Sequence, residues 1–372
     1  MKGKQKRDEE KQRVRIEETR ITGMLNFVVF LAVAAVAYTD WIVIPNVSLG
    51  YLYVLPIALS ALVNRPPLTV GLAVVCTVLQ DLFFGTAPET LEVRIFRDAI
   101  TLIGFLVVGF LVTLIARQRN RLIAEVRRQR DEYEHDLLLA AQVQRQVLPK
   151  PPVCADLELA AAMQTAQLLG GDYYDFFQIS DNVVDVVIAD VSGHGAAASL
   201  LMPSLAVALR LRARELSGPA AIIKDLDRVL QQITNSATFV TMFYARFDQA
   251  NKTLQYANGG HNPPLLIRAK TGQSLQLEAG GPIMGILRDA QFSNTMVALD
   301  QGDILTLFTD GVTEQENEAG DEFSISRLEE VVRSKETEPA AALVANITEA
   351  VSTFAGTKAQ VDDLTVVVVK VL

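Results

Sequence analysis

Four apolar stretches fill most of the first third of the chain. Three of them, Ile21 to Thr39, Leu49 to Val63 and Ala99 to Ala116, contain no charged residue, and Leu68 to Phe84 contains only Asp81. A helix needs about 20 residues to cross a bilayer, with a lower limit of roughly 17. The first and fourth stretches meet this length, and the other two lie near the limit. We therefore predict a transmembrane region of four helices over residues 21–116.

Basic residues predict the orientation of these helices. The tail over residues 1–20 holds eight Lys and Arg residues, six arginines lie within 117–130, and Arg65 separates the second and third stretches. The opposite side holds Arg94 and Arg97 together with three acidic residues. Since basic loops stay in the cytoplasm, we expect a multi-pass protein of the inner membrane with both termini cytoplasmic. No small-residue cleavage site follows the first stretch, which argues against a cleaved signal peptide.

A charged helical segment, residues 117–150, follows the fourth stretch. Its apolar residues recur at alternating spacings of three and four, interrupted by Arg130 and Gln144, which is the pattern of a short, imperfect coiled coil. The pattern indicates a homodimer formed through this linker helix; a single amphipathic helix packed on the next domain is the alternative. Prolines in "PKPP" at 149–152 end the helix. The apolar positions are Ile123, Val126, Tyr133, Leu137, Ala140 and Val147.

From residue 151 to 372 the pattern mixes both types of secondary structure. Runs rich in β-branched and aromatic residues predict strands, two of them joined as a hairpin, and longer amphipathic runs predict helices. Antiparallel strands beside paired helices indicate a layered α+β domain. The expected strands include 239–248, 252–261, 304–311 and 364–372, and the expected helices are 196–214, 219–234, 324–335 and 339–354.

Aspartates stand at or beside the ends of several predicted strands. An aspartate beside a glycine and a strand is usually a turn residue. Four such places in one domain suggest instead that the aspartates contribute to one common site. Carboxylates that converge at buried strand ends repel one another unless a cation neutralises them. The four places are "GGDYYDFF" with Asp172 and Asp175, "VVIADVSGHG" with Asp190, "LTLFTDG" with Asp310, and "VDDLTVVVV" with Asp362 and Asp363.

Composition narrows the chemistry of these carboxylates. The chain has 372 residues, of which 50% are hydrophobic, a mean hydropathy of +0.24 and a net charge of −9, so we expect no nucleic-acid partner. With only two cysteines and no histidine cluster, the oxygen donors favour Mg²⁺ or Mn²⁺ over zinc. Two such ions bridged by a carboxylate activate water for attack on phosphorus. Residues 151–209 contain no Lys or Arg, so the ions would do most of the phosphate binding.

Six motifs in order carry a family resemblance. They are "AAQVQRQVLPK", "GGDYYDFF", "VVIADVSGHGAAASLLM", "YANGGHNPPLL", "LTLFTDGVTEQEN" and "DDLTVVVV". From about residue 138 to 372 the chain resembles the SpoIIE/RsbU-type branch of metal-dependent serine/threonine protein phosphatases, relatives of the type 2C (PPM) class. The resemblance implies an α-β-β-α sandwich and a centre of two Mn²⁺ or Mg²⁺ ions.

The resemblance also assigns roles to individual residues. Asp190 would bridge both ions as the central catalytic carboxylate, and the carbonyl of Val191 would be a further ligand. Asp172, Asp310 and Asp362 would complete the site directly or through water. Asp363 is the less expected member of its pair, and Asp175 is a secondary candidate.

The same resemblance implies a substrate and a mode of control. The substrate would be a phosphoserine or phosphothreonine on an anti-sigma-factor antagonist of the STAS type, hydrolysed directly by a metal-activated hydroxide. The "AAQVQRQVLP" helix resembles a regulatory linker that couples dimer rearrangement to assembly of the metal site. One feature departs from the type 2C pattern, which uses an arginine near the metal centre to hold phosphate: residues 151–209 contain no arginine.

Three residues inside the motifs are secondary candidates. Gly193 allows a tight turn beside the metal site. His194 and His261 could contact phosphate or metal-bound water, although a histidine that fixes its own loop through hydrogen bonds is the more common arrangement.

Three other functions fit parts of the sequence. A catalytically inactive phosphatase fold acting as a binding module is the main alternative. A membrane histidine kinase is suggested by His135 in the linker helix, but no glycine-rich nucleotide loop of that class follows. A cyclic-dinucleotide cyclase is suggested by "GGDYYD", but that signature needs an acidic residue where Tyr173 stands.

Overall fold

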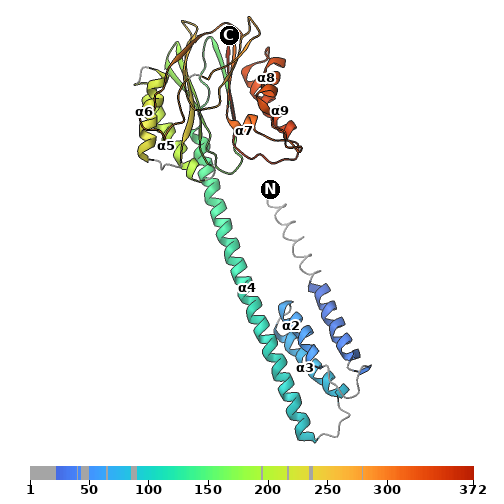
Figure 1. Ribbon diagram of the computed structural model, residues 1–372. Coiled ribbons are helices and arrows are strands. Elements are labelled where there is room, and N and C mark those ends of the chain that lie inside the picture. The colour runs from blue at the N-terminus through green and yellow to red at the C-terminus, as the bar shows by residue number, and fades with distance from the viewer. Residues whose placement is uncertain are drawn as a thin grey trace. The chain divides into compact units, whose positions relative to one another are not determined.

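The computed structural model describes residues 22–39, 41–42, 50–63, 66–84, 90–193, 196–215, 218–233, 238–278 and 280–372. The predicted basic tail over 1–20, Arg65 and the candidate His194 lie outside these residues. The chain forms two compact units, Met1–Glu132 and Tyr133–Leu372, which are described separately (Figure 1).

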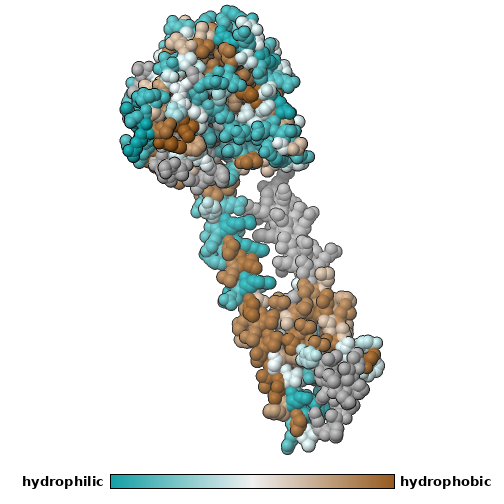
Figure 2. All heavy atoms as spheres, viewed as in Figure 1, coloured by the Kyte–Doolittle hydropathy of each residue, from teal (hydrophilic) through white to brown (hydrophobic). Residues whose placement is uncertain are grey.

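The first unit is helical. It contains a helix over Thr22–Thr39, a 3₁₀ turn η1 (Gly50–Tyr53), α2 (Val54–Val63), α3 (Pro66–Phe84) and the first part of α4 (Leu91–Val147). Its small core is formed by Val33, Tyr53, Ile57, Ala73, Cys76 and Phe105. Many large apolar side chains remain on its surface, as the brown colour in Figure 2 shows.

Two helices of the described chain are long and apolar enough to cross a membrane by length and composition. They are Thr22–Thr39 and a stretch of α4, whereas the apolar helices Gly50–Leu62 and Pro66–Leu82 are shorter. Two of the four predicted spans therefore meet the length requirement by themselves, and the four-span arrangement remains a proposal.

Helix α4 continues without a break from the fourth apolar stretch through the predicted linker. It spans 57 residues and ends at Val147, directly before the proline-containing segment that was expected to end it. Ile123, Val126 and Tyr133 of the predicted seam are exposed. Their exposure leaves the dimer a prediction.

The second unit is an α-β-β-α sandwich, as predicted. One sheet has the order β1-β10-β9-β6-β7 and the other β2-β3-β4-β5-β8, with antiparallel pairing between neighbouring strands. Helices α5 (Ala196–Arg212) and α6 (Pro219–Ile233) cover the second sheet; α9 (Ala340–Ala355) covers the first and packs with α8 (Ser324–Ser334) (Figure 1). The strands are β1 (Leu157–Gln164), β2 (Tyr173–Ser180), β3 (Val183–Val191), β4 (Val240–Asp248), β5 (Thr253–Gly259), β6 (Leu265–Ile267), β7 (Ser274–Gln276), β8 (Thr295–Ala298), β9 (Ile304–Phe308) and β10 (Leu364–Val371).

Strand β3 shows how one segment of sequence contributes to two layers of core. Val186 and Ile188 belong to the core between the sheets, whereas Val187 and Ala189 belong to the core beneath α5 and α6. Successive side chains of a strand point to opposite faces, so a strand covered on both faces is apolar throughout. This explains the unbroken apolar run before Asp190.

Two predicted strands end earlier than expected. Strand β5 ends at Gly259, because Gly260 adopts a positive φ of 73° and turns the chain before His261. Strand β9 ends at Phe308, and Asp310 instead begins the short helix α7 (Asp310–Thr313).

Candidate metal centre

The predicted carboxylates come from strand ends that meet at one end of the sandwich. In the second sheet, Tyr173 at the start of β2 pairs with Ala189 near the end of β3. In the first sheet, Phe308 at the end of β9 pairs with Val366 near the start of β10. By strand alternation Asp190 lies on the same face as Ile188, which contributes to the core between the sheets. Four of the six motifs therefore lead to one inter-sheet site.

Asp172 links the two sheets. Its Oδ2 accepts hydrogen bonds from the hydroxyls of Thr309, at 2.8 Å, and Thr365, at 2.5 Å. The side chain is almost completely buried, and burial raises its pKa well above the usual range, with the charge of Asp190 adding to the effect. The two hydroxyls act in the opposite direction and favour the ionised form.

Asp190 lies among like charges. Burial, together with the charges of Asp310, Asp362 and Asp363, raises its pKa to about 7. Burial and the charge of Asp362 also raise the pKa of Asp310. These shifts show that the carboxylates are close enough to repel one another.

Two glycines allow this convergence. A Cβ on Gly171 would lie 2.8 Å from the carbonyl oxygen of Val191, and a Cβ on Gly311 would lie 2.1 Å from the carbonyl oxygen of Asp363. Both contacts are too short for any other residue without movement of the backbone. The glycines of "GGD" and "TDG" therefore serve close backbone approach at the site.

The donor set fits a hard divalent cation, because it consists of carboxylate and carbonyl oxygens that are partly desolvated. Among the described residues no Lys or Arg forms an ion pair with Asp172, Asp190, Asp310, Asp362 or Asp363. In the same described part of the chain, no three Asp, Glu, His or Cys side chains already form a metal-binding cluster. Mutual repulsion between the carboxylates accounts for the distance between them.

Asp363 has a different place from its neighbour. Its Oδ1 accepts a hydrogen bond from the amide of Ala166 at 2.8 Å, and its Oδ2 accepts one from Gly171 at 2.7 Å. Asp362, in contrast, is exposed at the edge of the site. Asp363 thus stabilises, through these two hydrogen bonds, the loop that precedes Asp172.

Asp175 lies on the opposite face of the second sheet. Its buried carboxylate forms an ion pair with Arg210 at 2.9 Å and accepts a hydrogen bond from the hydroxyl of Tyr173. The structure therefore does not bring this candidate into the inter-sheet site. It also places Arg210 away from the site, because that guanidinium is engaged by Asp175.

The remaining described candidates are Gly193 and His261. Gly193 is exposed, with a φ of 87° in the turn after β3. His261 is buried, and its Nδ1 lies 2.8 Å from the hydroxyl of Thr241, the strand partner of Asp190. Burial lowers the pKa of His261 to about 4, so the ring is neutral at pH 7. The side chain of Asn258 fixes the backbone of His261, since its Nδ2 donates to the His261 carbonyl and its Oδ1 accepts from the His261 amide.

Gln144 was named in the sequence only as an interruption of the apolar pattern, without a functional role. It belongs to the last turns of α4 and is buried, and its side chain pairs with both backbone groups of Gly170. Its Nε2 donates to the Gly170 carbonyl at 2.6 Å, and its Oε1 accepts from the Gly170 amide at 3.3 Å. Gln144 and the buried Ala141, three residues apart, lie on the face of α4 that packs against the sandwich domain. The coiled-coil interpretation counted Gln144 as an interruption because it considered only apolar positions.

Comparison with known families separates the two parts of the chain. The family described as Stage II sporulation protein E (SpoIIE) matches residues 180–372, more than half of the chain. A domain of unknown function, DUF4118, matches residues 22–134.

Comparison with individual proteins agrees with the family match. The chain is 33% identical over 190 residues to phosphoserine phosphatase RsbU of Bacillus subtilis, an alignment that covers 51% of this chain and 56% of RsbU. The chain thus spans little more than half the length of that relative.

Solved structures share the sandwich. The SiaA-PP2C domain of Pseudomonas aeruginosa aligns with a TM-score of 0.59 at 21% identity, covering 65% of this chain and 98% of that domain. The RsbU and RsbW domains of Rv1364c from Mycobacterium tuberculosis align with a TM-score of 0.51 at 26% identity, covering 59% of this chain and 61% of that one.

Proposed function

The chain belongs to the SpoIIE family of PP2C-type phosphatase domains, and we propose that it is a metal-dependent protein serine/threonine phosphatase. One observation carries this proposal. Five aspartates from both sheets gather at one end of the sandwich, and the described residues supply no cation to neutralise them. A site of this kind needs cations from outside the chain.

Two Mg²⁺ or Mn²⁺ ions would be held by Asp172, Asp190, Asp310, Asp362 and the carbonyl of Val191. Bound there, such ions activate a water and neutralise the charge of a phosphoryl group. The protein's own contribution is to hold these oxygens in place: Thr309 and Thr365 orient Asp172, and Asp363 orients the loop before it.

The substrate would be a phosphoserine or phosphothreonine on an anti-sigma-factor antagonist of the STAS type. Two findings support this choice: the relative RsbU is a phosphoserine phosphatase, and the structural neighbour Rv1364c carries RsbU and RsbW domains in one chain. Removal of the phosphate would let the antagonist capture an anti-sigma factor, so the phosphatase would act in partner-switching signalling.

The membrane would anchor this activity, and α4 would connect the two units. Helix Thr22–Thr39, the apolar part of α4 and the surface of the first unit support membrane anchoring. The exposed apolar side chains of Ile123, Val126 and Tyr133 support a homodimer along α4. The two hydrogen bonds between Gln144 and Gly170 connect the end of this helix directly to the loop before Asp172.

The proposal is tested with the full chain in its membrane fraction. We expect release of phosphate from a phosphoserine protein in Mn²⁺ or Mg²⁺, no release in EDTA, and loss of activity in Asp190→Asn and Asp362→Asn. Asp181→Asn is the matched control, since Asp181 is an exposed carboxylate in the turn between β2 and β3. Metal-independent activity would contradict the mechanism, and a folded protein that binds the phosphoprotein but binds no metal and releases no phosphate would identify an inactive binding module instead.

A further inference from the structure

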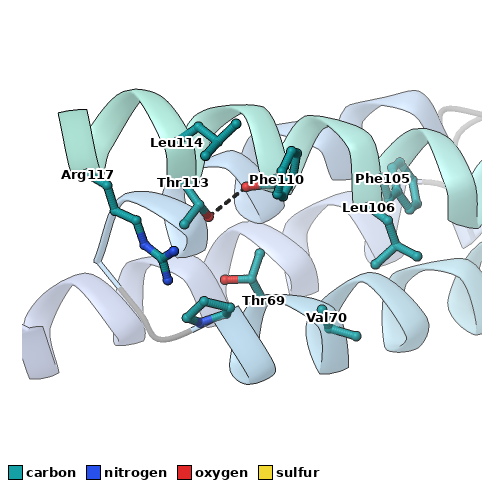
Figure 3. A pocket seen from close by; sticks show the side chains of 10 residues that line it. Thr69, Val70, Phe105, Leu106, Phe110, Thr113, Leu114 and Arg117 are labelled. Carbon is teal, nitrogen blue, oxygen red and sulfur yellow. Dashed lines mark hydrogen bonds between the residues drawn. The ribbon is translucent and has the colours of Figure 1, made fainter. Parts of the chain in front are cut away.

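A cavity of about 180 Å³ lies within the N-terminal unit, between α3 and α4. Figure 3 shows Phe105 and Leu106 at one end, Arg117 at the other, and Thr69 and Thr113 between them. The phosphatase site does not involve these residues. The cavity combines an apolar path with one cationic end.

The apolar path follows α4. Phe105 and Arg117 are twelve residues apart, which corresponds to about 18 Å at 1.5 Å per residue. Gly109 lies on the wall of the cavity, where a Cβ would come within 3.1 Å of the Thr69 methyl group. Leu106 and Phe110 add apolar surface along this path. The shape suits a long, flexible apolar chain.

The polar end has one strong donor. The Thr113 hydroxyl donates to the carbonyl of Gly109 at 2.7 Å, and the Thr69 hydroxyl lies 3.5 Å from that of Ser60. Arg117 is exposed, and no carboxylate of the described residues forms an ion pair with it. An exposed guanidinium without an ion pair favours a phosphate or carboxylate, which it can bind with two parallel hydrogen bonds.

We propose that this cavity binds an anionic phospholipid. The phosphate of the lipid pairs with Arg117, and one acyl chain lies along Leu106 and Phe110 toward Phe105. Basic pockets between membrane helices on the cytoplasmic side are suited to anionic head groups, and Arg117 is the first of six arginines within 117–130, the side predicted to be cytoplasmic. The inference rests on the membrane anchoring proposed above.

A soluble anion would use only part of this site. Inorganic phosphate could pair with Arg117, but it would leave the path from Leu106 to Phe105 without an occupant. A zwitterionic lipid such as phosphatidylcholine would fill the path, but its own choline cation offsets the phosphate charge that pairs with Arg117. Only a molecule with both an anionic head group and an acyl chain matches the whole cavity.

The first step of the test is the location of the full chain. Membranes containing the protein are washed with alkaline carbonate, and the chain is measured in the pellet and the supernatant. Release into the supernatant would overturn both the membrane anchoring and the lipid site. Retention in the pellet leaves the lipid site to be decided by the second step.

In the second step the full chain is placed in nanodiscs of phosphatidylcholine with added phosphatidylglycerol, and the lipid retained by the purified protein is measured by mass spectrometry. We expect preferential retention of phosphatidylglycerol. Arg117→Gln should weaken it about fivefold, the ratio that corresponds to about 1 kcal/mol for one basic residue. Arg121→Gln, one turn further along α4 and outside the cavity, should leave it unchanged.

A second pair of variants tests the apolar path. Leu106→Trp should fill the cavity and reduce retention, whereas Leu111→Trp, at an exposed position outside the cavity, should not. Equal losses in Arg117→Gln and Arg121→Gln would indicate diffuse attraction to the surface and overturn the site. Absence of any preference for phosphatidylglycerol, or its complete displacement by inorganic phosphate, would also overturn it. If Leu106→Trp does not fold, the arginine pair decides the outcome.

Discussion

Strand β3 carries one aspartate on each face, and Asp172 directly before β2 and Asp175 within it repeat the arrangement, so buried carboxylates on the two faces can be compared. On the face toward α5 and α6, Asp175 pairs with Arg210 and Tyr173, and Asp185 pairs with Arg246 and Tyr244. On the face between the sheets, Asp172 and Asp190 have hydroxyls or other carboxylates as neighbours.

Within one sheet, this contrast separates carboxylates with a structural role from carboxylates of the candidate metal site. A buried carboxylate that already has an arginine needs no other partner, whereas a buried cluster without one is stable only if it binds protons or cations. The distinction does not follow from burial alone, because Asp172, Asp175 and Asp185 are all nearly inaccessible.

The largest expected effect comes from breaking an arginine pair. Arg246→Met leaves Asp185 buried without its cation, and loss of one partner of a buried pair costs about 3–5 kcal/mol. We expect this decrease in the free energy of unfolding by urea titration, with most of it restored in the double variant Asp185→Asn, Arg246→Met. A loss below about 1 kcal/mol in the single variant would show that the pair does not neutralise Asp185.

His261 provides a buried ionisable group that remains neutral. Its pKa is lowered to about 4 from the ordinary value of 6.5, so between these values the unfolded chain binds a proton that the folded chain does not. The stabilising contribution is complete above about pH 6.5 and is lost as the pH falls toward 4, by up to about 3 kcal/mol. Urea titrations at several pH values measure this slope, and His261→Gln should reduce it; an unchanged slope would assign it to other groups.

Gln144 tests whether the candidate site depends on the end of α4. Gln144→Ala leaves both backbone groups of Gly170 without their partner, a loss of about 1–3 kcal/mol. We expect the variant to need a roughly tenfold higher Mn²⁺ concentration for half-maximal activity. Gln142→Ala, at an exposed position of the same helix, is the control. The same metal requirement in both variants would separate the helix from the site.

The smallest effect has the opposite sign from the first. In the absence of divalent cations, Asp190→Asn should stabilise the domain by about 1 kcal/mol, because it removes one of several repelling charges. The same substitution should lower phosphatase activity at least about a hundredfold. A stability loss as large as that of Arg246→Met would mean that Asp190 is a structural carboxylate.

The sequence predicted long, strongly patterned elements best. Strands β4 and β10 and helices α5, α6, α8 and α9 lie within a few residues of their expected positions. Strands β6, β7 and β8, with three or four residues each, were not predicted because so short a segment has no periodicity. The linker was predicted as a separate segment, but α4 is continuous, since nothing between residues 116 and 147 interrupts a helix.

The candidate site was predictable as far as strand ends determine it. Asp172, Asp190, Asp310 and Asp362 share a position beside a strand end, and the structure brings them to one end of the sandwich. The environment of Asp175 was not predictable, because its partner Arg210 lies 35 residues away on α5. The same limit applies to Asp363, whose hydrogen bonds reach Ala166 and Gly171 across almost 200 residues.

The central claim is that the inter-sheet carboxylates, and not the arginine-paired ones, bind divalent cations. Calorimetric titration of the full chain in detergent with Mn²⁺ tests it most directly, with Asp190→Asn and Asp185→Asn as the matched pair. The account predicts saturable binding by the parent protein and by Asp185→Asn, and loss of binding in Asp190→Asn. Binding that survives in Asp190→Asn, or a folded parent protein that binds no Mn²⁺, would contradict it.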